Sequence, residues 1–457
     1  MINFARFLLP LIFMLCSILV FGLNTHSGYT YLFLHPLAYS ISFFVVLYKC
    51  LYIKPFRPFL FVFTLIGFLR YVLLPLFIVI SGYYSGRSPA EPLDRSYQAA
   101  IFLMTWELIA CTLFISFMEN RQKFYVRRFN KEFIKNDKNY VYIIFIIFAF
   151  GLLLINPKAL LYINFITPSI LESDIQADFV TNLTIYFFLI AKVILVLIIL
   201  EKCKKRDNLF AYIVAITAII VNIMIFWGTN KSDILIAGLA SVLVFHRIYG
   251  DKSIRVLLVL GVLTLSIMSF VNSERNPQTV SGGTDKWVDR TDKVQIYTGG
   301  TYNVAIALET KEYYPESTDF EVLVFDIFRP MIGPNILLKD KVQNYSNIYF
   351  NDRIWTNVDR RSQIIPMVGQ ANLFLGYIFA PLFSIIFIFI AYKLERIYFL
   401  TKNIEVYYFV SLGLIRLGFI FGQNTMNMIN DLSMNLFLFY MIFIINKWFS
   451  KALRLSR

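Results

Sequence analysis

Cysteine, histidine and charge are all scarce in this chain, and each scarcity excludes a class of protein. Among 457 residues there are 4 cysteines and 3 histidines, and charged residues make up 16%. None of the cysteines falls in the most polar stretch, residues 272–364, so the disulfide framework of a small secreted domain cannot form there. No Cys/His cluster has the spacing of a zinc site. We therefore expect no metal and no other cofactor.

Apolar residues, by contrast, are abundant. They make up 58% of the chain, and the mean hydropathy is +0.63, which is more apolar surface than a soluble protein of this size can bury. The apolar runs are continuous, whereas barrel strands alternate with a period of two residues, so the sequence predicts membrane-spanning helices. Twelve stretches approach the ~20 residues that cross a bilayer. These predicted spans are residues 7–23, 31–51, 58–80, 97–118, 140–155, 182–200, 209–227, 233–245, 254–271, 374–392, 406–421 and 434–449.

The positions of lysine and arginine orient these spans. Both residues are concentrated in the loops at residues 121–138, 202–206 and 393–402 and at the end of the chain, whereas residues 24–30 and 422–431 contain neither. With twelve spans the positive loops all fall on one face, which is cytoplasmic by the positive-inside rule. Both termini are then cytoplasmic. The net charge of +14 is explained by this topology rather than by nucleic-acid binding.

One long hydrophilic stretch, residues 272–364, interrupts the apolar pattern and is termed the polar segment below. It contains 11 Lys and Arg and 13 Asp and Glu, and it follows nine predicted spans, which places it outside the cytoplasm. We therefore predict an all-α polytopic membrane protein of about 12 transmembrane helices with one large extracytoplasmic loop that contains short helices. Its parts are residues 1–271 with nine spans, residues 272–364 as the loop and residues 365–457 with three spans.

Two short helices are predicted inside the polar segment. Residues 302–312 form one helical pattern, and a second is ended by Pro330 and Pro334. The apolar residues of this second helix, termed the apolar stripe, are Phe320, Leu323, Val324, Ile327 and Phe328. The sequence favours packing of the stripe onto the helix bundle, and contact with the membrane surface is the alternative.

Charged side chains flank both points where the polar segment meets the membrane. Glu274 and Arg275 stand at its start, and Asp359, Arg360 and Arg361 stand at its end. A guanidinium group can bind two phosphate oxygens and stays charged at every biological pH. The arginines are therefore candidates to bind a lipid pyrophosphate at the height of the headgroups. Pairing with Glu274 and Asp359, or snorkelling to the interface, is the alternative.

Charged residues inside predicted spans are a second source of candidates. Arg70, Glu107, Lys192 and Arg416 are costly in hydrocarbon, so each is expected to face protein or a water-filled cavity. Arg70 and Arg416 are candidates for phosphate binding, although pairing of Arg70 with Glu107 is slightly favoured and Lys192 is expected to be structural. Lys231 is a further candidate, because it stands at the start of a predicted helix and helix N-termini attract anions.

This architecture resembles the Wzy-type repeat-unit polymerases of O-antigen and capsule synthesis, which have many spans, both termini inside and one large, late external loop. At the level of motifs, Arg360 is followed by fifteen residues and then Gly376, a spacing similar to one in the external loops of that family. The run Gly228-Thr229-Asn230-Lys231 with Ile234 resembles a turn of related ligases and polymerases. Lys231 replaces the usual arginine, which removes bidentate binding of phosphate.

The resemblance implies an enzyme of the bacterial inner membrane that joins oligosaccharide repeat units. The donor would be a glycan on undecaprenyl pyrophosphate, and the acceptor would be a hydroxyl of a new lipid-linked unit. Undecaprenyl pyrophosphate would leave. Glu274 or Asp359 is the expected general base, and Arg329, Gln363 and Gln370 are candidates to bind sugars. Membrane lipid, a chain-length regulator and a flippase are the implied partners.

Two other functions stay open. An O-antigen-ligase-like transfer to a different acceptor is disfavoured, because such ligases generally use a loop histidine and the polar segment has none. A lipid-linked oligosaccharide flippase, or another transporter, is compatible with twelve helices and intramembrane charges. Transporters commonly show repeated halves, whereas the nine-to-three division of the predicted spans shows no repeat.

Overall fold

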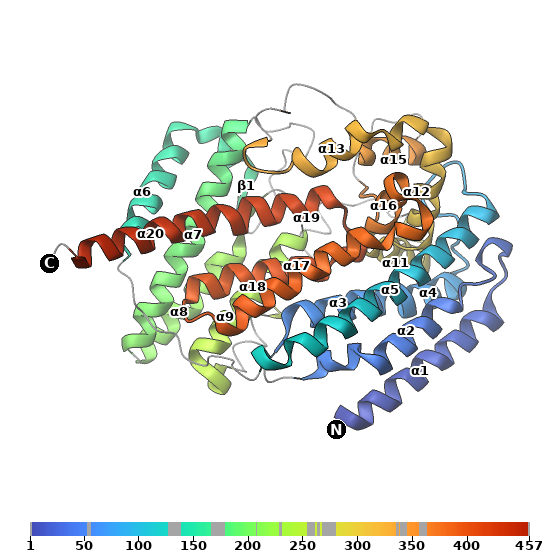
Figure 1. The fold of residues 1–457 in the computed structure, drawn as a ribbon, viewed down its shortest axis with the longest axis horizontal. Coiled ribbons are helices and arrows are strands. Elements are labelled where there is room, and N and C mark those ends of the chain that lie inside the picture. The colour runs from blue at the N-terminus through green and yellow to red at the C-terminus, as the bar shows by residue number, and fades with distance from the viewer. Residues whose placement is uncertain are drawn as a thin grey trace. The chain divides into compact units, whose positions relative to one another are not determined.

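The computed structural model describes residues 2–52, 56–126, 139–165, 179–206, 208–227, 231–253, 261–262, 266, 280–334, 338, 345–355 and 363–455. Within them, all regular structure is helical apart from two short strands (Figure 1). The chain divides into two compact units. Unit 1 comprises Met1–Arg127, Gln278–Arg396 and Arg416–Asp431, and unit 2 comprises Arg128–Pro277, Ile397–Ile415 and Leu432–Arg457.

Unit 1 combines the N-terminal helices with the helices of the polar segment. The N-terminal elements are α1 (Ile2–Leu23), η1 (Ser27–Tyr29), α2 (Leu34–Val45), η2 (Leu47–Leu51), α3 (Pro58–Phe68), η3 (Leu69–Leu73), α4 (Leu74–Ser81) and α5 (Asp94–Val126). The later elements are α11 (Lys286–Thr298), α12 (Thr301–Tyr313), η6 (Pro315–Thr318), α13 (Phe320–Phe328), α15 (Ser346–Ile354), α16 (Met367–Phe379), most of α17 (Pro381–Leu400), η7 (Ile420–Gly422) and α19 (Thr425–Asp431). The helices predicted at residues 302–312 and 320–328 are confirmed as α12 and α13.

Unit 2 contains the middle and the end of the chain. Its elements are α6 (Tyr140–Ile155), η4 (Pro157–Tyr162), β1 (Ile163–Phe165), α7 (Phe179–Arg206), α8 (Leu209–Met224), β2 (Ile225–Trp227), α9 (Lys231–Tyr249), η5 (Gly250–Ser253), most of α18 (Ile404–Gly418), η8 (Leu432–Phe437) and α20 (Leu438–Leu455). The two strands pair antiparallel with Asn164 opposite Phe226. Nearby, Leu153, Ala159, Ile185 and Phe188 form a buried apolar cluster.

The sequence predicts a structural role for Lys192, which lies in an apolar span, and the structure confirms it. Its Nζ atom donates to the carbonyl oxygens of Asn222 (2.9 Å) and Ile225 (2.8 Å). These carbonyls lie at the C-terminal end of α8, where the last turn of a helix lacks partners of its own. The ammonium group therefore stabilises the junction between α8 and β2.

Long apolar helices mark this chain as a multi-pass membrane protein. Among the described residues, five helical segments are long and apolar enough to cross a bilayer: Phe4–Leu23, Pro58–Ser81, Asp94–Arg121, Val180–Arg206 and Thr425–Ala452. The bent pair α16–α17 makes a sixth if it counts as one span, and α6, α8 and most of α9 are apolar but shorter.

The count of long spans is therefore lower than the twelve predicted. The stretch predicted at residues 31–51 is divided into α2 and η2, neither of which is long enough to cross alone. Most of the stretch predicted at residues 254–271 lies outside the described residues. Apolar length in the sequence does not show where a helix breaks, so it overestimates the number of straight spans.

The span predicted at residues 374–392 is wrong as a single straight helix. α16 and α17 meet at an angle of 107°, and Gly376 has φ 73° and ψ 176°, a conformation that essentially only glycine adopts. Neighbouring residues fix the bend to α5, because Trp106 donates from Nε1 to the carbonyl of Ile378 (3.0 Å) and the Tyr377 hydroxyl donates to the carbonyl of Ala99 (3.2 Å). α16 thus leaves the axis of α17 and packs against α12.

A second break places an arginine in the apolar interior. Between α3 and α4 the chain forms a π-helical turn, Leu69–Leu73. Pro75 follows it and has no N–H group to donate to the carbonyl of Tyr71, four residues earlier. Such local widening is common in helices that carry a functional residue. Here the turn contains Arg70, which is fully buried.

Unit 1 has two chemically different ends. At the first, termed the Arg57 end, Arg57 lies between Glu119 and Glu395 at 2.5 Å from each carboxylate, and Lys49 lies 3.1 Å from Glu119. α3 begins beside Arg57 and α4 ends at Ser81, while α5 runs from Asp94 past Glu119. The connection between α4 and α5 therefore lies at the opposite end. α11, α12 and α15 pack there, so it is termed the polar-segment end.

We predict that Gly376→Ala destabilises unit 1 by about 1–3 kcal/mol, because alanine is strained at this φ and ψ. Thermal unfolding in detergent micelles measures the change. Gly22→Ala is the matched control, since Gly22 is a helical glycine of α1 with open space at the position of a new Cβ. Equal melting temperatures for Gly376→Ala and the wild type would contradict the role given to the bend.

Candidate functional site

Most of the charged candidates at the membrane boundary lie outside the described residues. These are Glu274, Arg275, Asp359, Arg360 and Arg361. Lys231 is the first residue of α9, as its predicted place at a helix start requires, but its side chain is also outside the described part. Their proposed roles remain predictions from the sequence. The structure does describe Arg70, Arg329, Gln363, Gln370 and Arg416.

Arg70 is the centre of a buried network that joins the bundle to the polar segment. Its Nη1 atom donates to Oε2 of Glu107 on α5 (2.8 Å), and its Nε atom donates to the carbonyl of Gly299 (3.1 Å). The second carboxylate oxygen of Glu107 accepts a hydrogen bond from Ser384 on α17 (2.7 Å). The pairing of Arg70 with Glu107 that the sequence slightly favours is therefore confirmed.

Unpaired polar atoms surround the turn Gly299-Gly300, which joins α11 to α12. Nη2 of Arg70 and both amide atoms of Gln295 are buried without a hydrogen-bond partner in the described structure, as are the Thr301 hydroxyl and Oδ1 of Asn303. α12 begins at this turn without a side-chain cap. Buried polar atoms are nearly always satisfied in proteins, often by ordered water. We therefore expect this turn to hold water or a polar group in the interior of unit 1.

Arg416, the second phosphate-binding candidate within a predicted span, is paired with an acidic side chain. Its Nε atom forms an ion pair with Oδ2 of Asp431, and both side chains are largely buried. Pairing in the interior is the arrangement expected when a charged residue falls within an apolar span. The predicted phosphate role of Arg416 would require this pair to open.

Gln370 belongs to a second buried network, which links four helices of unit 1. Its Nε2 atom donates to Oδ2 of Asp326 on α13 (2.7 Å) and to Oγ of Ser346 on α15 (3.1 Å). Its Oε1 atom accepts from the backbone N–H of Thr425 at the start of α19 (2.8 Å). The other oxygen of Asp326, Oδ1, accepts from the backbone N–H of Ser346 (3.2 Å). Both hydrogen-bonding atoms of Gln370 are thus used by protein, so its evident role is structural.

Gln363 is held in a different way. Its backbone is bound by the side chain of Asn351, which donates to the Gln363 carbonyl (2.8 Å) and accepts from its N–H (3.0 Å). One turn earlier on α15, Asn347 accepts from the N–H of Ile365 (2.9 Å). Both atoms of the Gln363 side-chain amide are buried without a partner in the described structure. Of the sugar-binding candidates, Gln363 is therefore the one whose amide is held in place and still unpaired.

Two ionic contacts of the polar segment were not anticipated from the sequence. Arg353 on α15 pairs with Glu309 on α12, and Glu309 also accepts from the N–H of Leu93 (2.8 Å). Arg87 binds Asp292 on α11 through Nε (2.9 Å) and Nη2 (2.5 Å). The partners are separated by 44 residues in the first pair and by 205 residues in the second, and no local pattern connects them. They are buried or half-buried. Through Arg87 and Leu93 they join the polar segment to the N-terminal part of unit 1.

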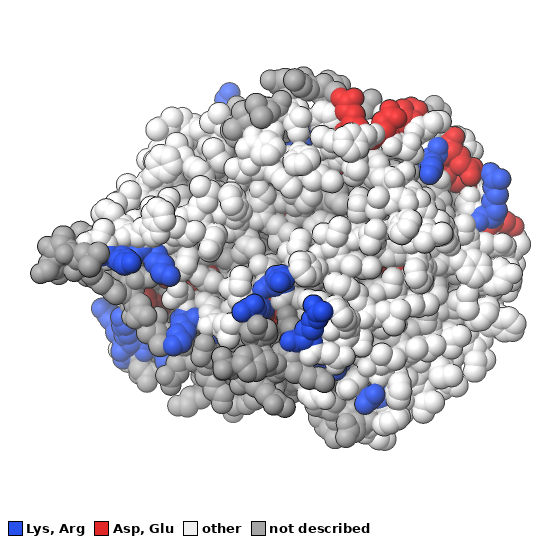
Figure 2. Space-filling view, viewed as in Figure 1, with Lys and Arg blue, Asp and Glu red and all other residues white. Residues whose placement is uncertain are grey.

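The exposed surface at the polar-segment end is acidic. Glu312, Glu316, Asp319 and Glu321 are exposed around α12, η6 and the start of α13, and Figure 2 shows Asp and Glu side chains gathered in this region. Lys311 is also exposed there, and exposed Arg95 pairs with Glu312 at 2.9 Å. Arg329 at the end of α13 is covered in part by the ring of Tyr345, 5.0 Å away. An acidic surface repels phosphate, so a pyrophosphate site at this end depends on arginines set apart from it.

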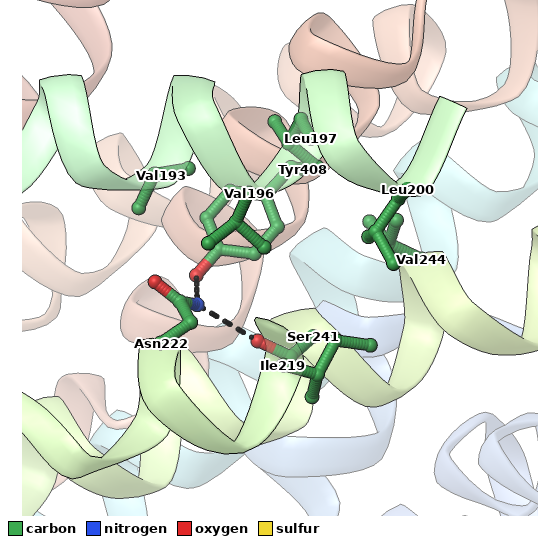
Figure 3. Close-up of a pocket in the computed structure, with 9 residues that line it drawn as sticks. All are labelled: Val193, Val196, Leu197, Leu200, Ile219, Asn222, Ser241, Val244 and Tyr408. Atoms are coloured by element: carbon green, nitrogen blue, oxygen red, sulfur yellow. Dashed lines mark hydrogen bonds between the residues drawn. The ribbon is translucent and has the colours of Figure 1, made fainter. Parts of the chain in front are cut away.

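The one pocket described lies in unit 2, and its geometry does not suit a ligand. Residues of α7, α8, α9 and α18 line it (Figure 3). Asn222 points into it and donates to the Ser241 hydroxyl (3.1 Å) and the Tyr408 hydroxyl (3.0 Å). The remaining space is too small for a water molecule. Among the described residues, no group of three or more His, Cys, Asp or Glu could hold a metal ion.

No family model, no curated protein and no solved structure matches this chain.

We predict that the Arg70–Glu107 pair is strongly coupled. Arg70→Met or Glu107→Gln alone should destabilise unit 1 by about 3–5 kcal/mol, because each leaves a buried charge without its partner. The double variant should lose less than the sum of the two. Thermal unfolding of the four proteins of this mutant cycle gives the coupling energy. Additive losses would contradict a direct pair.

We also predict that Asp326 makes stability depend on pH. Burial raises the pKa of Asp326 from 3.8 to about 6, although the hydrogen bonds from Ser346 and Gln370 and the nearby Arg329 lower it. The folded protein then holds the proton more tightly than the unfolded chain. The stabilisation is complete below pH ~4 and is lost as the pH rises to ~6, with a slope of at most about 1.4 kcal/mol per pH unit.

Replacing Asp326 with asparagine should remove this slope. The stability of the wild type relative to Asp326→Asn should fall between about pH 4 and about pH 6, the window between the unfolded and folded pKa values, and then stay constant. Asp319→Asn, at an exposed position on the same helix boundary, is the control. A wild-type advantage that is the same at every pH would show that Asp326 has an ordinary pKa.

Proposed function

We propose that this chain polymerises lipid-linked oligosaccharide repeat units at the outer face of a bacterial inner membrane. The observation that supports this most is the fold of the polar segment. Its helices α11, α12, α13 and α15 form a buried, hydrogen-bonded structure at one end of an apolar bundle, opposite the Arg57 end. A flexible linker between spans would not bury charged pairs such as Arg353–Glu309. A structured lobe at a membrane boundary suits an enzyme whose substrate has a lipid anchor.

The proposed topology has twelve spans, with both termini in the cytoplasm and the polar segment outside. Eleven of the twelve stretches predicted from the sequence overlap a described helix, from α1 through α20. The Arg57 end would face the cytoplasm, where the positive loops are concentrated. The connection between α4 and α5 would lie outside together with the polar segment, as their contacts through Arg87 and Asp292 require.

The proposed reaction is a glycosyl transfer. A hydroxyl of the new lipid-linked unit attacks the anomeric carbon of the growing glycan, the bond from that carbon to the pyrophosphate oxygen breaks, and undecaprenyl pyrophosphate leaves. Glu274 or Asp359 takes the hydroxyl proton. Arg275, Arg360 and Arg361 stabilise the charge that develops on the leaving pyrophosphate.

The described residues would have supporting roles. Arg70 lies beside the Gly299-Gly300 turn with one N–H₂ group unpaired. This group would donate a hydrogen bond to a polar group of the substrate that enters the interior. Gln363, with its free amide, would bind a sugar hydroxyl. The products would be O-antigen or capsular polysaccharide, and a chain-length regulator and a flippase would act with this protein.

A ligase-like transfer is the second candidate, because one histidine lies at the polar-segment end. His26 precedes η1 and lies 3.4 Å from Glu91 and 4.0 Å from Asp94. However, its Nδ1 atom accepts from the N–H of Gly28 (3.0 Å), while Nε2 faces Glu91. Neither ring nitrogen is free to take a proton from an acceptor hydroxyl, so polymerisation is the better supported reaction.

We predict that Arg360→Ala lowers polymerisation by about 100-fold, the usual loss when one charge-stabilising donor is removed. Arg361→Lys keeps the charge but loses the two-point contact, and it should lower the rate by about 10-fold, in line with one lost hydrogen bond to a charged group. The glycan ladder on a gel, at equal protein expression, measures both. Lys286→Ala, an exposed cation at the start of α11, should leave the ladder unchanged.

The same experiment separates the alternatives. In cells without this protein, loss of a polymerase leaves single repeat units on the surface lipid, whereas loss of a flippase traps lipid-linked units on the cytoplasmic side. Trapped units would replace the proposal with transport. Full ladders from both arginine variants would remove the proposed site.

A further inference from the structure

α13 presents part of its apolar stripe outward. Phe320 is 77% exposed and Phe328 is 42% exposed, and Leu323, Val324 and Ile327 are only partly covered. The buried residues of the helix are Val322, Phe325 and Asp326. The packing of the stripe onto the bundle that the sequence favours therefore holds only in part, because Phe320 and Phe328 are exposed and the most buried face of the helix is a different one.

The inner face of α13 is held both by apolar contact of Val322 and Phe325 and by hydrogen bonds to Asp326. Asp326 accepts hydrogen bonds from Ser346 on α15 and from Gln370 on α16. It is the one charged residue among the three buried residues of the helix. Turning the stripe inward would expose Asp326 and break both contacts. An outward apolar face and an inward carboxylate are the reverse of the pattern of a helix that faces water.

The surroundings of α13 indicate what covers this face. The helix packs against α15 and α19, and α19 opens Thr425–Ala452, one of the apolar segments long enough to cross a bilayer. Glu316, Asp319 and Glu321 cluster at the N-terminal end of α13, and past Glu321 its only charged residue is the inward Asp326. Arg329 follows the helix, stacked over Tyr345, a pairing of residue types common at membrane interfaces.

We propose that the outward face of α13 lies against the acyl chains of membrane phospholipid. The acidic N-terminal end stays in water, and the exposed part of the stripe faces lipid. Large exposed apolar patches on proteins mark contact with protein or membrane, and the position beside a membrane-spanning segment selects the membrane. This assignment does not depend on the enzymatic proposal, since it holds equally for a transporter.

Spin labels on a cysteine-free background test the assignment in phospholipid vesicles. Single cysteines at Val324 and Ile327 carry the nitroxide, and these positions are partly exposed, so the label does not displace core. Collision with oxygen, which concentrates in lipid, is compared with collision with a water-soluble nickel chelate. Leu15, 60% exposed on α1, is the lipid reference, Glu316 is the water reference and buried Val322 is the protein-covered reference.

We expect labels at Val324 and Ile327 to collide with oxygen as strongly as the label at Leu15, and with nickel several-fold less than the label at Glu316. Nickel collisions equal to those at Glu316 would place the stripe in water and overturn the assignment. Low collisions with both reagents, as at Val322, would show that protein covers it, whether a second copy or another subunit, and would overturn it as well.

Discussion

The ion pair between Arg70 and Glu107 is the interaction on which unit 1 depends. Neither charge can be stable alone in an apolar interior, so each requires the other. Glu107 extends the pair to Ser384 on α17, and Arg70 extends it to the carbonyl of Gly299 in the polar segment. One salt bridge therefore joins the N-terminal bundle, a late span and the turn between α11 and α12. The pair is thus one polar anchor of the polar segment in the core of the bundle.

Other buried polar groups of the polar segment are also held by hydrogen bonds and ion pairs to neighbouring elements. α15 makes several of these contacts. Ser346 binds Asp326 on α13 and Gln370 on α16, Asn347 and Asn351 bind residues 363–365, and Arg353 binds α12. A short helix with so many buried polar contacts has few alternative positions, since each displacement leaves several groups unpaired. The described helices of the polar segment thus form a packed lobe rather than a connecting loop. Such packing is what positioning of a reacting group requires.

Local patterns in the sequence were sufficient for some features and insufficient for others. The 3.6-residue period predicts α13, and the cost of a charge in hydrocarbon predicts the pairing of Arg70. The bend at Gly376 was missed, because a glycine inside an apolar run looks the same whether it is helical or has positive φ. The pair Arg353–Glu309 was missed because it joins residues that are distant in the chain. The buried face of α13 was missed for a similar reason: Ser346 and Gln370, which hold Asp326, lie outside its own helix.

The distribution of charge over unit 1 bears on the substrate that it suits. A lipid-linked glycan has three parts in three environments: a chain in hydrocarbon, phosphates at the headgroups and sugars in water. Unit 1 offers an exposed apolar face on α13 and an acidic exposed surface around Glu316 and Asp319. The candidate arginines are predicted from the sequence where the polar segment meets the membrane. The acidic surface repels phosphate but not neutral sugar, so it would keep the anionic carrier at the headgroups while the glycan extends into water. A transporter that moves the whole molecule through its interior has no need of that separation, which is why we favour an enzyme.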